Sequence, residues 1–452
     1  MRIHPHDLLL QELATASPDI RRKCLEHLDR CPGCRDKHHV FLRSRQGTPA
    51  NKVLPFGRGE ALSAEYNPAI ERATRFLSTV EDLYAKERAE ASSLYADLTQ
   101  YPIGRRLLLV RNCRRFHTWG FCELLLSQSQ EQNFQDPSLG ESTALLAVEV
   151  LDHLEPSLYG SESLEDLRAR AWAYVGNSRR VKADLQGAEE AFAFAFAFLR
   201  LGAGEPMDRA LLLDLKASLL TKQGQFSKAL SFLHRSVAIF LELGEKHRAG
   251  RALVNMSAVH SLAGDPEQAI FLLYRALTLI DPAREPRLML IARHNLIDDL
   301  IETGQLMQAQ KMLVKARPLY KRFPQPWFQN PRKWVEGKIA RGLGQVDRAE
   351  TLLLAARDGF LLTGAAYDTA LVSLDLASLY AQQGRIAELK SLAEEMLPIF
   401  SSRQIHREAL AAMDYWRQAV EAERAGVALV ARVASFLHKA RHNPELRFQR
   451  PE

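Results

Sequence analysis

A repeat with one constant period constrains this chain more than any other feature of its sequence. Five glycines recur at the same interval, namely Gly224, Gly264, Gly304, Gly344 and Gly384. The first four open the same word, Gly-x4-Ala, and the fifth opens a copy that closes with leucine. A fixed period of about 40 residues is typical of proteins that stack one structural unit many times. We therefore expect a solenoid over residues 161–420.

Each repeat is predicted to be a pair of helices joined by a tight turn at the glycine, which tolerates the backbone conformation that such a turn needs. Apolar residues keep a fixed phase around it. Nine residues after the glycine stand Leu233, Leu273, Leu313 and Leu353, and sixteen residues after it stand Phe240, Ile280, Tyr320, Phe360 and Phe400. Five residues before it stand Leu219, Val259, Ile339 and Leu379, with Asp299 as the exception. Because one helix pair cannot bury such a face alone, the pairs must stack.

An earlier and weaker copy of the repeat places Asp184 at the glycine position. It precedes the alternating stretch 191–199, Ala-Phe-Ala-Phe-Ala-Phe-Ala-Phe-Leu, whose period of two is typical of a strand. We predict a helix there, because alanine favours helix and the repeat phase puts a second helix at this place.

The small-residue phase of the repeats, Ala-Leu-Ser-Phe-Leu at 229–233 and Ala-Ile-Phe-Leu-Leu at 269–273, resembles the second helix of the tetratricopeptide (TPR) superfamily. The resemblance covers roughly residues 160–420. It implies an all-α, helical-hairpin (TPR-like) solenoid whose concave face holds a peptide or helix of a partner protein. The usual TPR unit has about 34 residues, so the helices or joints here should be longer.

Three of the five cysteines fall within eleven residues near the N-terminus, which indicates a metal site. The pattern is His27-x3-Cys31-x2-Cys34. Two thiolates with an imidazole select tetrahedral zinc over cations that prefer oxygen. The spacing leaves three upstream candidates for a fourth ligand, His4, His6 and Cys24. The alternatives are a redox dithiol, which would need a nearby strand–helix unit, and incidental polar and core positions.

This word and the preceding Ser17-Pro18 helix start resemble the zinc-containing anti-sigma-factor family. The resemblance implies a small helical zinc-binding module with His4, His27, Cys31 and Cys34 as ligands, and a sigma factor as one possible partner. Two features depart from the family. The connection from His4 to His27 is shorter than usual, and the membrane span that often follows this module is missing.

Composition divides the rest of the chain. We expect the zinc module at 1–45, a glycine- and proline-bearing linker at 46–66, and a long helix with a divergent first repeat at 67–160. The TPR-like repeats at 161–420 and a C-terminal helix and tail at 421–452 follow. Cys113 and Cys122 are expected to be buried, inert thiols within the divergent repeat.

The sequence carries no phosphate loop, dinucleotide fingerprint, nucleophile elbow or His-Glu-x-x-His word, so we expect a non-enzymatic protein. No apolar run reaches the length of a membrane span, and the N-terminus has no signal-peptide core. Both absences predict a cytoplasmic location. The net charge of +6 permits nucleic-acid or acidic-protein partners without requiring either.

Two sets of residues are candidates for partner binding. Asn255 and Asn295 occupy equivalent places nine residues before their glycines, and asparagine side chains in such a ladder can hydrogen-bond a peptide backbone. The alternative is that both brace neighbouring helices. The second set is an arginine stripe with no acid among its members: Arg105, Arg106, Arg111, Arg114 and Arg115. It supports an alternative function, a nucleic-acid-binding regulator that uses this stripe and the basic N-terminal unit, unless it is simply a solvated helix face.

Overall fold

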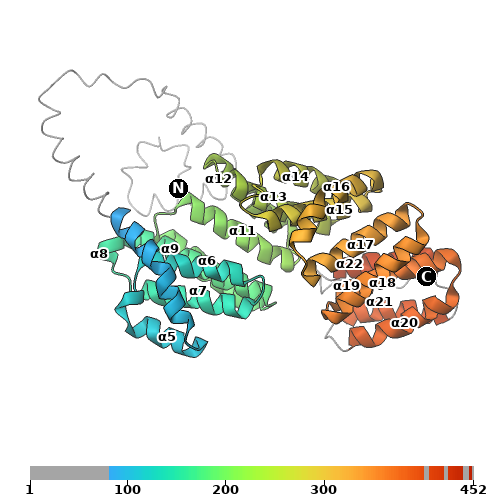
Figure 1. The fold of residues 1–452 in the computed structure, drawn as a ribbon, viewed down its shortest axis with the longest axis horizontal. Coiled ribbons are helices and arrows are strands. Elements are labelled where there is room, and N and C mark those ends of the chain that lie inside the picture. The colour runs from blue at the N-terminus through green and yellow to red at the C-terminus, as the bar shows by residue number, and fades with distance from the viewer. Residues whose placement is uncertain (1–80, 402–406, 422–425, 441–446, 450–452) are drawn as a thin grey trace, which may run out of the picture. The chain divides into compact units, whose positions relative to one another are not determined.

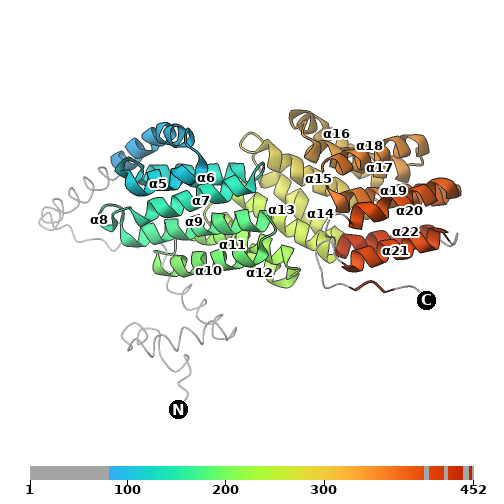
Figure 2. The same cartoon turned by 90° about the horizontal axis from the view of Figure 1, so that it is seen from below.

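The computed structural model describes residues 81–401, 407–421, 426–440 and 447–449 (Figures 1 and 2). The chain divides into two compact units, Met1–Leu83 and Tyr84–Glu452. The predicted zinc module, the linker and the start of the long helix lie outside the described residues, and the domain boundaries stay predictions. Among the described residues all regular structure is helical, without a strand, which confirms the predicted all-α class.

The second unit begins within a helix over 81–99, which is followed by an irregular group of short and long helices. These are α5 (Ile103–Asn112), the 3-10 helix η1 (Arg114–Phe116), α6 (Trp119–Gln132), α7 (Pro137–Asp152) and α8 (Pro156–Tyr159).

Helical hairpins follow, and each helix packs beside the next (Figure 2). The first helices of the hairpins are α9 (Ser161–Val181), α11 (Pro206–Lys222), α13 (Lys246–Ala263), α15 (Pro286–Glu302), α17 (Pro326–Gly342), α19 (Ala366–Gln383) and α21 (Arg407–Glu421). The second helices are α10 (Leu185–Leu201), α12 (Phe226–Glu242), α14 (Pro266–Leu279), α16 (Leu306–Arg322), α18 (Val346–Leu362), α20 (Ile386–Ser401) and α22 (Val427–Ala440). The predicted TPR-like solenoid of stacked helical hairpins is thereby confirmed.

The turn within each repeat is built as the glycine spacing predicts. All five repeat glycines have left-handed φ angles, between 69° and 84°. The amide after each glycine donates to a carbonyl five residues back, as from Gln225 to Leu220 at 2.9 Å and from Gln305 to Leu300 at 2.8 Å. This is the Schellman arrangement, which satisfies carbonyls that the helix end leaves open.

The register predicted for the weaker copy is wrong by one residue. Ala183, not Asp184, has the left-handed φ of 65°, and the amide of Asp184 donates to Arg179 in the same Schellman pattern. Asp184 is instead the N-cap of α10, where its carboxylate accepts from the amide of Gly187 at 2.9 Å. The turn at Ala183 therefore lies one residue further from Gly224 than the interval between the repeat glycines, so counting back by that interval missed it.

The phased residues are the core of the solenoid. The alanine five residues after each of the first four glycines is fully buried, and the leucine and large apolar residue that follow in phase are nearly so. Phe400 alone lies outside the described side chains. The 191–199 stretch forms the middle of α10, as predicted, with Phe192 buried and Phe194 half-exposed against Trp172.

Asp299, the polar exception in the phase, is buried at a position where the other repeats carry leucine, valine or isoleucine. The hydroxyl of Ser261 on α13 donates to its carboxylate at 2.6 Å, so the exception ties α13 to α15. Burial raises the pKa of Asp299 to about 7.

The helix over 81–99 packs against α6 without a side chain between them at Gly120. The buried Glu87 accepts from the hydroxyl of Tyr159 at 2.6 Å and from the amide of Gly120 at 3.2 Å. Cys122 is buried in the same core, and burial raises the pKa of its thiol. Cys113 is only partly buried, so the prediction of a buried thiol is wrong there.

Within the residues that the structure describes, no helix is both long enough and apolar enough to span a bilayer.

Candidate functional site

The first helices of successive hairpins contact one another from α9 to α19. One side of each therefore contributes to a continuous surface, which we call the first-helix face. Polar side chains join neighbouring first helices at several places along this face. Arg170 of α9 donates to both carboxylate oxygens of Asp208 on α11 at 2.6 and 2.9 Å, and Lys338 of α17 donates to Asp298 on α15 at 2.8 Å. Asp375 of α19 accepts from the indole of Trp334 at 2.7 Å and from Arg341 at 2.8 Å.

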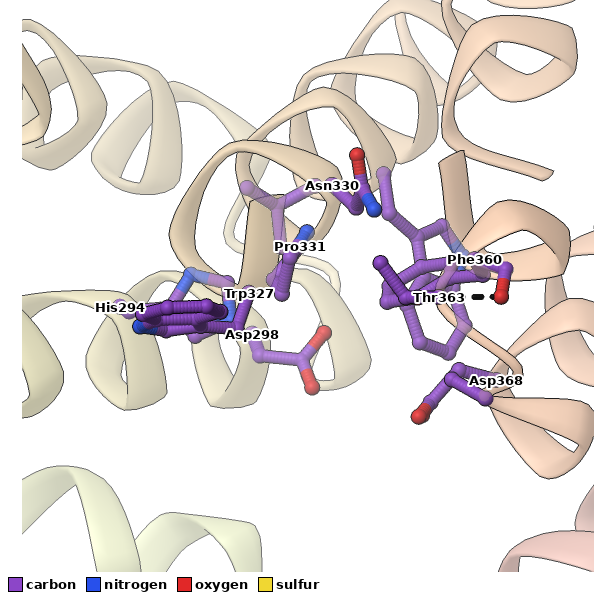
Figure 3. A pocket seen from close by; sticks show the side chains of 11 residues that line it. His294, Asp298, Trp327, Asn330, Pro331, Phe360, Thr363 and Asp368 are labelled. Atoms are coloured by element: carbon purple, nitrogen blue, oxygen red, sulfur yellow. Dashed lines mark hydrogen bonds between the residues drawn. The ribbon is translucent and has the colours of Figure 1, made fainter. Parts of the chain in front are cut away.

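A cavity of about 380 Å³ lies on this face where α15, α17 and the α18–α19 turn meet (Figure 3). The contribution of α17 is Trp327, Asn330, Pro331, Trp334 and Val335, whose spacing places them on one side of the helix. The neighbouring elements add His294 and Asp298 from α15, Phe360 from α18, Thr363 and Ala365 from the turn, and Asp368 from α19. The cavity therefore draws on three successive repeats.

Aromatic rings and two carboxylates characterise the cavity. Trp327 is 58% exposed, whereas Trp334 and Phe360 are buried and meet edge to face with ring centroids 5.8 Å apart. Asp298 and Asp368 enter from opposite elements, as Figure 3 shows. Among the described residues neither lysine nor arginine lines the cavity, although Lys338 of α17 donates to Asp298 from outside it.

His294 contributes a neutral imidazole to this wall. Its Nδ1 atom lies 2.7 Å from the hydroxyl of Tyr320, which approaches from α16. Burial lowers the pKa of His294, with a smaller opposing effect from the carboxylate of Asp298. At neutral pH the ring is therefore uncharged and adds no positive charge to the cavity.

Asn330 is the unusual polar group of the cavity. Only 4% of the residue is exposed, and its Nδ2 atom has no hydrogen-bond partner within the described chain. The residue fits only because Gly359 of α18 faces it. A Cβ atom at position 359 would lie 2.2 Å from Asn330 Oδ1. A buried amide donor without an acceptor costs about 1–3 kcal/mol, so an acceptor on a bound molecule would stabilise it.

Asn255 and Asn295, which occupy equivalent positions of the repeat, have different surroundings in the structure. Asn255 donates through Nδ2 to the buried carboxylate of Asp214 on α11 at 2.8 Å, which is a bracing contact between first helices. Burial raises the pKa of Asp214, and the hydrogen bond from Asn255 opposes that shift. Asn295 is half-buried on α15, and no side-chain hydrogen bond of Asn295 occurs within the described part of the chain. Their role in partner binding stays a prediction.

The other predicted sites divide between described and undescribed residues. His4, His27, Cys31 and Cys34, with the alternatives His6 and Cys24, lie outside the described residues. The arginine stripe is described, and much of it is engaged within the fold. Arg111 pairs with Glu149 at 2.8 Å and Arg115 with Asp97 at 3.1 Å, while Arg106 donates to the carbonyls of Thr99 and Tyr101. These contacts favour the interpretation of the stripe as helix surface over a phosphate-binding surface.

Sequence reasoning missed the cavity. Its signal is the stretch 326–334, Pro-Trp-Phe-Gln-Asn-Pro-Arg-Lys-Trp, in which two tryptophans and a second proline interrupt the ordinary composition of a first helix. This density of aromatic residues differs from the equivalent stretch of the other repeats.

Comparison with known proteins agrees with this architecture. Residues 208–280 match the tetratricopeptide repeat family. The crystal structure of a Rap protein complexed with Competence and Sporulation Factor aligns over 71% of this chain and 87% of that chain, with a TM-score of 0.55 and 10% sequence identity. No curated protein matches the sequence.

Two further solved structures align less well. Aspartyl phosphate phosphatase F from Bacillus subtilis covers 75% of this chain and 95% of its own, with a TM-score of 0.43 and 13% identity. BtubC (BKLC) from P. vanneervenii covers 52% of this chain and 90% of its own, with a TM-score of 0.37 and 16% identity. Taken together, the glycine turns, the stacked hairpins, the family match at 208–280 and the first of these structures show that the chain has the fold of a TPR-like solenoid.

Proposed function

We propose that the first-helix face binds an extended segment of a partner protein, and that the chain acts as a non-enzymatic interaction scaffold or regulator. The observation that carries this proposal is the cavity on that face, which three repeats build and which contains a buried amide donor without a partner in the described chain. An extended peptide supplies both side chains and backbone carbonyls to such a surface. The Rap protein of similar fold was crystallised with Competence and Sporulation Factor, which supports the same use of the fold here.

Asn295→Ala tests the proposal with little disturbance of the fold. Because Asn295 makes no side-chain hydrogen bond within the described chain, the free energy of unfolding should change by less than about 0.5 kcal/mol. The protein is immobilised, and a random peptide library is passed over it. The amount of peptide that the protein retains should fall in the variant if Asn295 contacts the backbone of a bound peptide. Equal melting temperature and equal retention would remove Asn295 from the site.

Asn255→Ala is the contrasting variant. Its loss leaves the buried Asp214 carboxylate without its side-chain donor, so the free energy of unfolding should fall by roughly 1–3 kcal/mol. Denaturant titration measures this loss. Reduced peptide retention by Asn255→Ala under conditions where the protein remains folded would extend the binding ladder to Asn255, whereas unchanged retention would restrict that residue to bracing.

We also propose, from the residue spacing and from the resemblance to the zinc-containing anti-sigma-factor family, that the N-terminal module binds one zinc ion and docks a second partner in a transcription-related role, with a sigma factor as the candidate. Thiolates of Cys31 and Cys34 and the imidazole of His27 would hold the ion, with His4 as the upstream ligand. Bound zinc would hold the module's helices together. It need not alter the solenoid, which forms a separate compact unit.

Metal analysis of the purified full chain tests the zinc site. We expect about one zinc per chain in the wild type and a large loss in the Cys31→Ser/Cys34→Ser double variant, because serine does not replace a thiolate as a zinc ligand. Cys113→Ser is the matched control, since Cys113 lies in the other unit. Equal zinc content in the wild type and the double variant would refute the assignment.

A further inference from the structure

We propose that the cavity between α15, α17 and the α18–α19 turn binds a basic residue of the peptide, with its guanidinium or ammonium group between the carboxylates and the Trp327 indole. This inference rests on the proposed function of the first-helix face. It adds the chemical class of the residue that the face selects.

Charge is the first argument. The two carboxylates of the cavity come from different repeats, and no lysine or arginine of the described chain lines the wall between them. Lys338 does bond to Asp298 from the adjoining turn of α17, yet the Asp298 side chain remains 47% exposed. A carboxylate has about four acceptor positions, so Asp298 can accept further donors.

The aromatic groups supply the second argument. A cation is attracted to the face of an indole, and Trp327, which lines the cavity, is more than half exposed. The protein already uses this combination once. The ammonium of Lys338 lies 4.4 Å from the centroid of the Trp334 ring while it bonds to Asp298. A basic side chain in the cavity would make the same pair of contacts with Trp327 and a carboxylate.

The third argument is the unpaired amide donor of Asn330, which the backbone of a bound peptide can satisfy. Its buried Nδ2 atom needs an acceptor, which an ammonium or guanidinium group does not offer but a peptide carbonyl does. Pro331 adds a complementary acceptor. Because proline has no N–H, the carbonyl of Trp327 lacks its usual donor four residues ahead. Trp327 and Asn330 lie within one turn of α17, so one extended peptide can offer an acceptor to Asn330 and a donor to the Trp327 carbonyl.

Other ligand classes fit less well. An anion would face two carboxylates without a lysine or arginine of the described residues in the cavity wall. A metal ion would need a third ligand, and among the described residues no group of three His, Cys, Asp or Glu side chains is arranged to hold one. The Nδ1 atom of His294 is moreover engaged with Tyr320. The cavity therefore fits an organic cation attached to a carbonyl.

Three small probes added to the full chain separate the parts of the inference. N-acetyl-arginine N-methylamide carries both the cation and the carbonyls, its citrulline analogue keeps the shape without the charge, and butylguanidinium keeps the charge without the carbonyls. We expect the citrulline analogue to bind about 10-fold more weakly than the arginine probe, since hydrogen bonds to charged groups are the stronger ones. Butylguanidinium should also bind more weakly. Tryptophan fluorescence and NMR titration measure the dissociation constants.

Variants place the binding in the cavity. Asp368→Asn should weaken the arginine probe by about 5- to 10-fold, and Trp327→Ala by about 5-fold. Asp358→Asn is the matched control, because Asp358 is an exposed aspartate of α18 that does not line the cavity. Equal affinity for the arginine and citrulline probes, or equal effects of the two aspartate variants, would overturn the inference. Butylguanidinium binding as tightly as the arginine probe would overturn the role of Asn330.

The peptide library distinguishes this inference from the proposed function. A chain that retains library peptides without preference for arginine or lysine keeps the proposed function and loses the basic-residue site. Conversely, a chain that binds the arginine probe in an Asp368-dependent manner but retains no peptide keeps the cavity as a cation site and loses the proposed function.

Discussion

Gly120→Ala should destabilise the protein by roughly 3 kcal/mol or more, since the added methyl group has no space and overpacking a tight contact is costly. A Cβ atom at position 120 would lie 2.5 Å from the backbone of both Glu87 and Arg88 in the helix over 81–99. A side chain could rotate away, but here the backbone of a whole helix must move. The expected result is a lower melting temperature and faster hydrogen exchange in residues 81–99.

The substitution should also break contacts between the helix over 81–99 and α6, which cross at Gly120. Separation of the two helices would break the bidentate pair of Arg88 and Glu123, and would remove Gly120 from the carboxylate of Glu87. Gly104→Ala is the matched control, because nothing lies within 4 Å of a Cβ atom there. Alanine in α5 should stabilise the helix by about 0.5–1 kcal/mol. Similar effects of the two substitutions would show that the crossing is looser than the structure has it.

Asp299→Asn should stabilise the protein at pH 8, on the order of 2–4 kcal/mol, because it removes the cost of a buried charge. Burial raises the pKa of Asp299 to about 7 from its ordinary value of 3.8, and the hydroxyl of Ser261 opposes that shift. Asparagine keeps the oxygen that accepts from Ser261, so the tie between α13 and α15 remains. Thermal unfolding at several pH values measures the gain.

The stabilisation by Asp299→Asn is expected to depend on pH. The folded protein holds the Asp299 proton up to about pH 7, whereas the unfolded chain releases it near 3.8. Stability from this group is therefore fully present below about pH 4 and is lost as the pH rises through about 7. The advantage of Asp299→Asn should grow over that window and stay constant above it. Asp358→Asn, at an exposed position of α18, should show no such growth. An advantage equal at pH 5 and pH 8 would refute the buried-charge account.

The repeat could be read from the sequence because its signals are local. A glycine at a left-handed turn, an alanine where helices approach closely and a leucine in phase each follow from the backbone or from one helix face. These signals recur at one interval, and the structure confirms them at Gly224, Ala229 and Leu233 and at their equivalents. The helical state of 191–199 followed from the same phase, against its alternating pattern.

The structure differs from the repeat pattern where one repeat departs from the rest. Counting back by the repeat interval placed Asp184 at the turn, but an extra residue makes Ala183 the left-handed position and leaves Asp184 to cap the next helix. Asn255 and Asn295 look equivalent along the chain. Only Asn255 has an aspartate opposite it on the preceding first helix, since position 254 of that neighbouring repeat carries valine where Asp214 stands.

By itself the sequence determined the fold class, the period and the buried phase of this protein, because these depend on contacts within a helix or between neighbours in sequence. The tertiary structure decided the candidate site. Asp298, Trp327 and Asp368 lie in three different repeats, and no period links their residue types. Their convergence follows from how α15, α17 and α19 pack, and the orphan donor of Asn330 exists only because Gly359 leaves room for it from another helix.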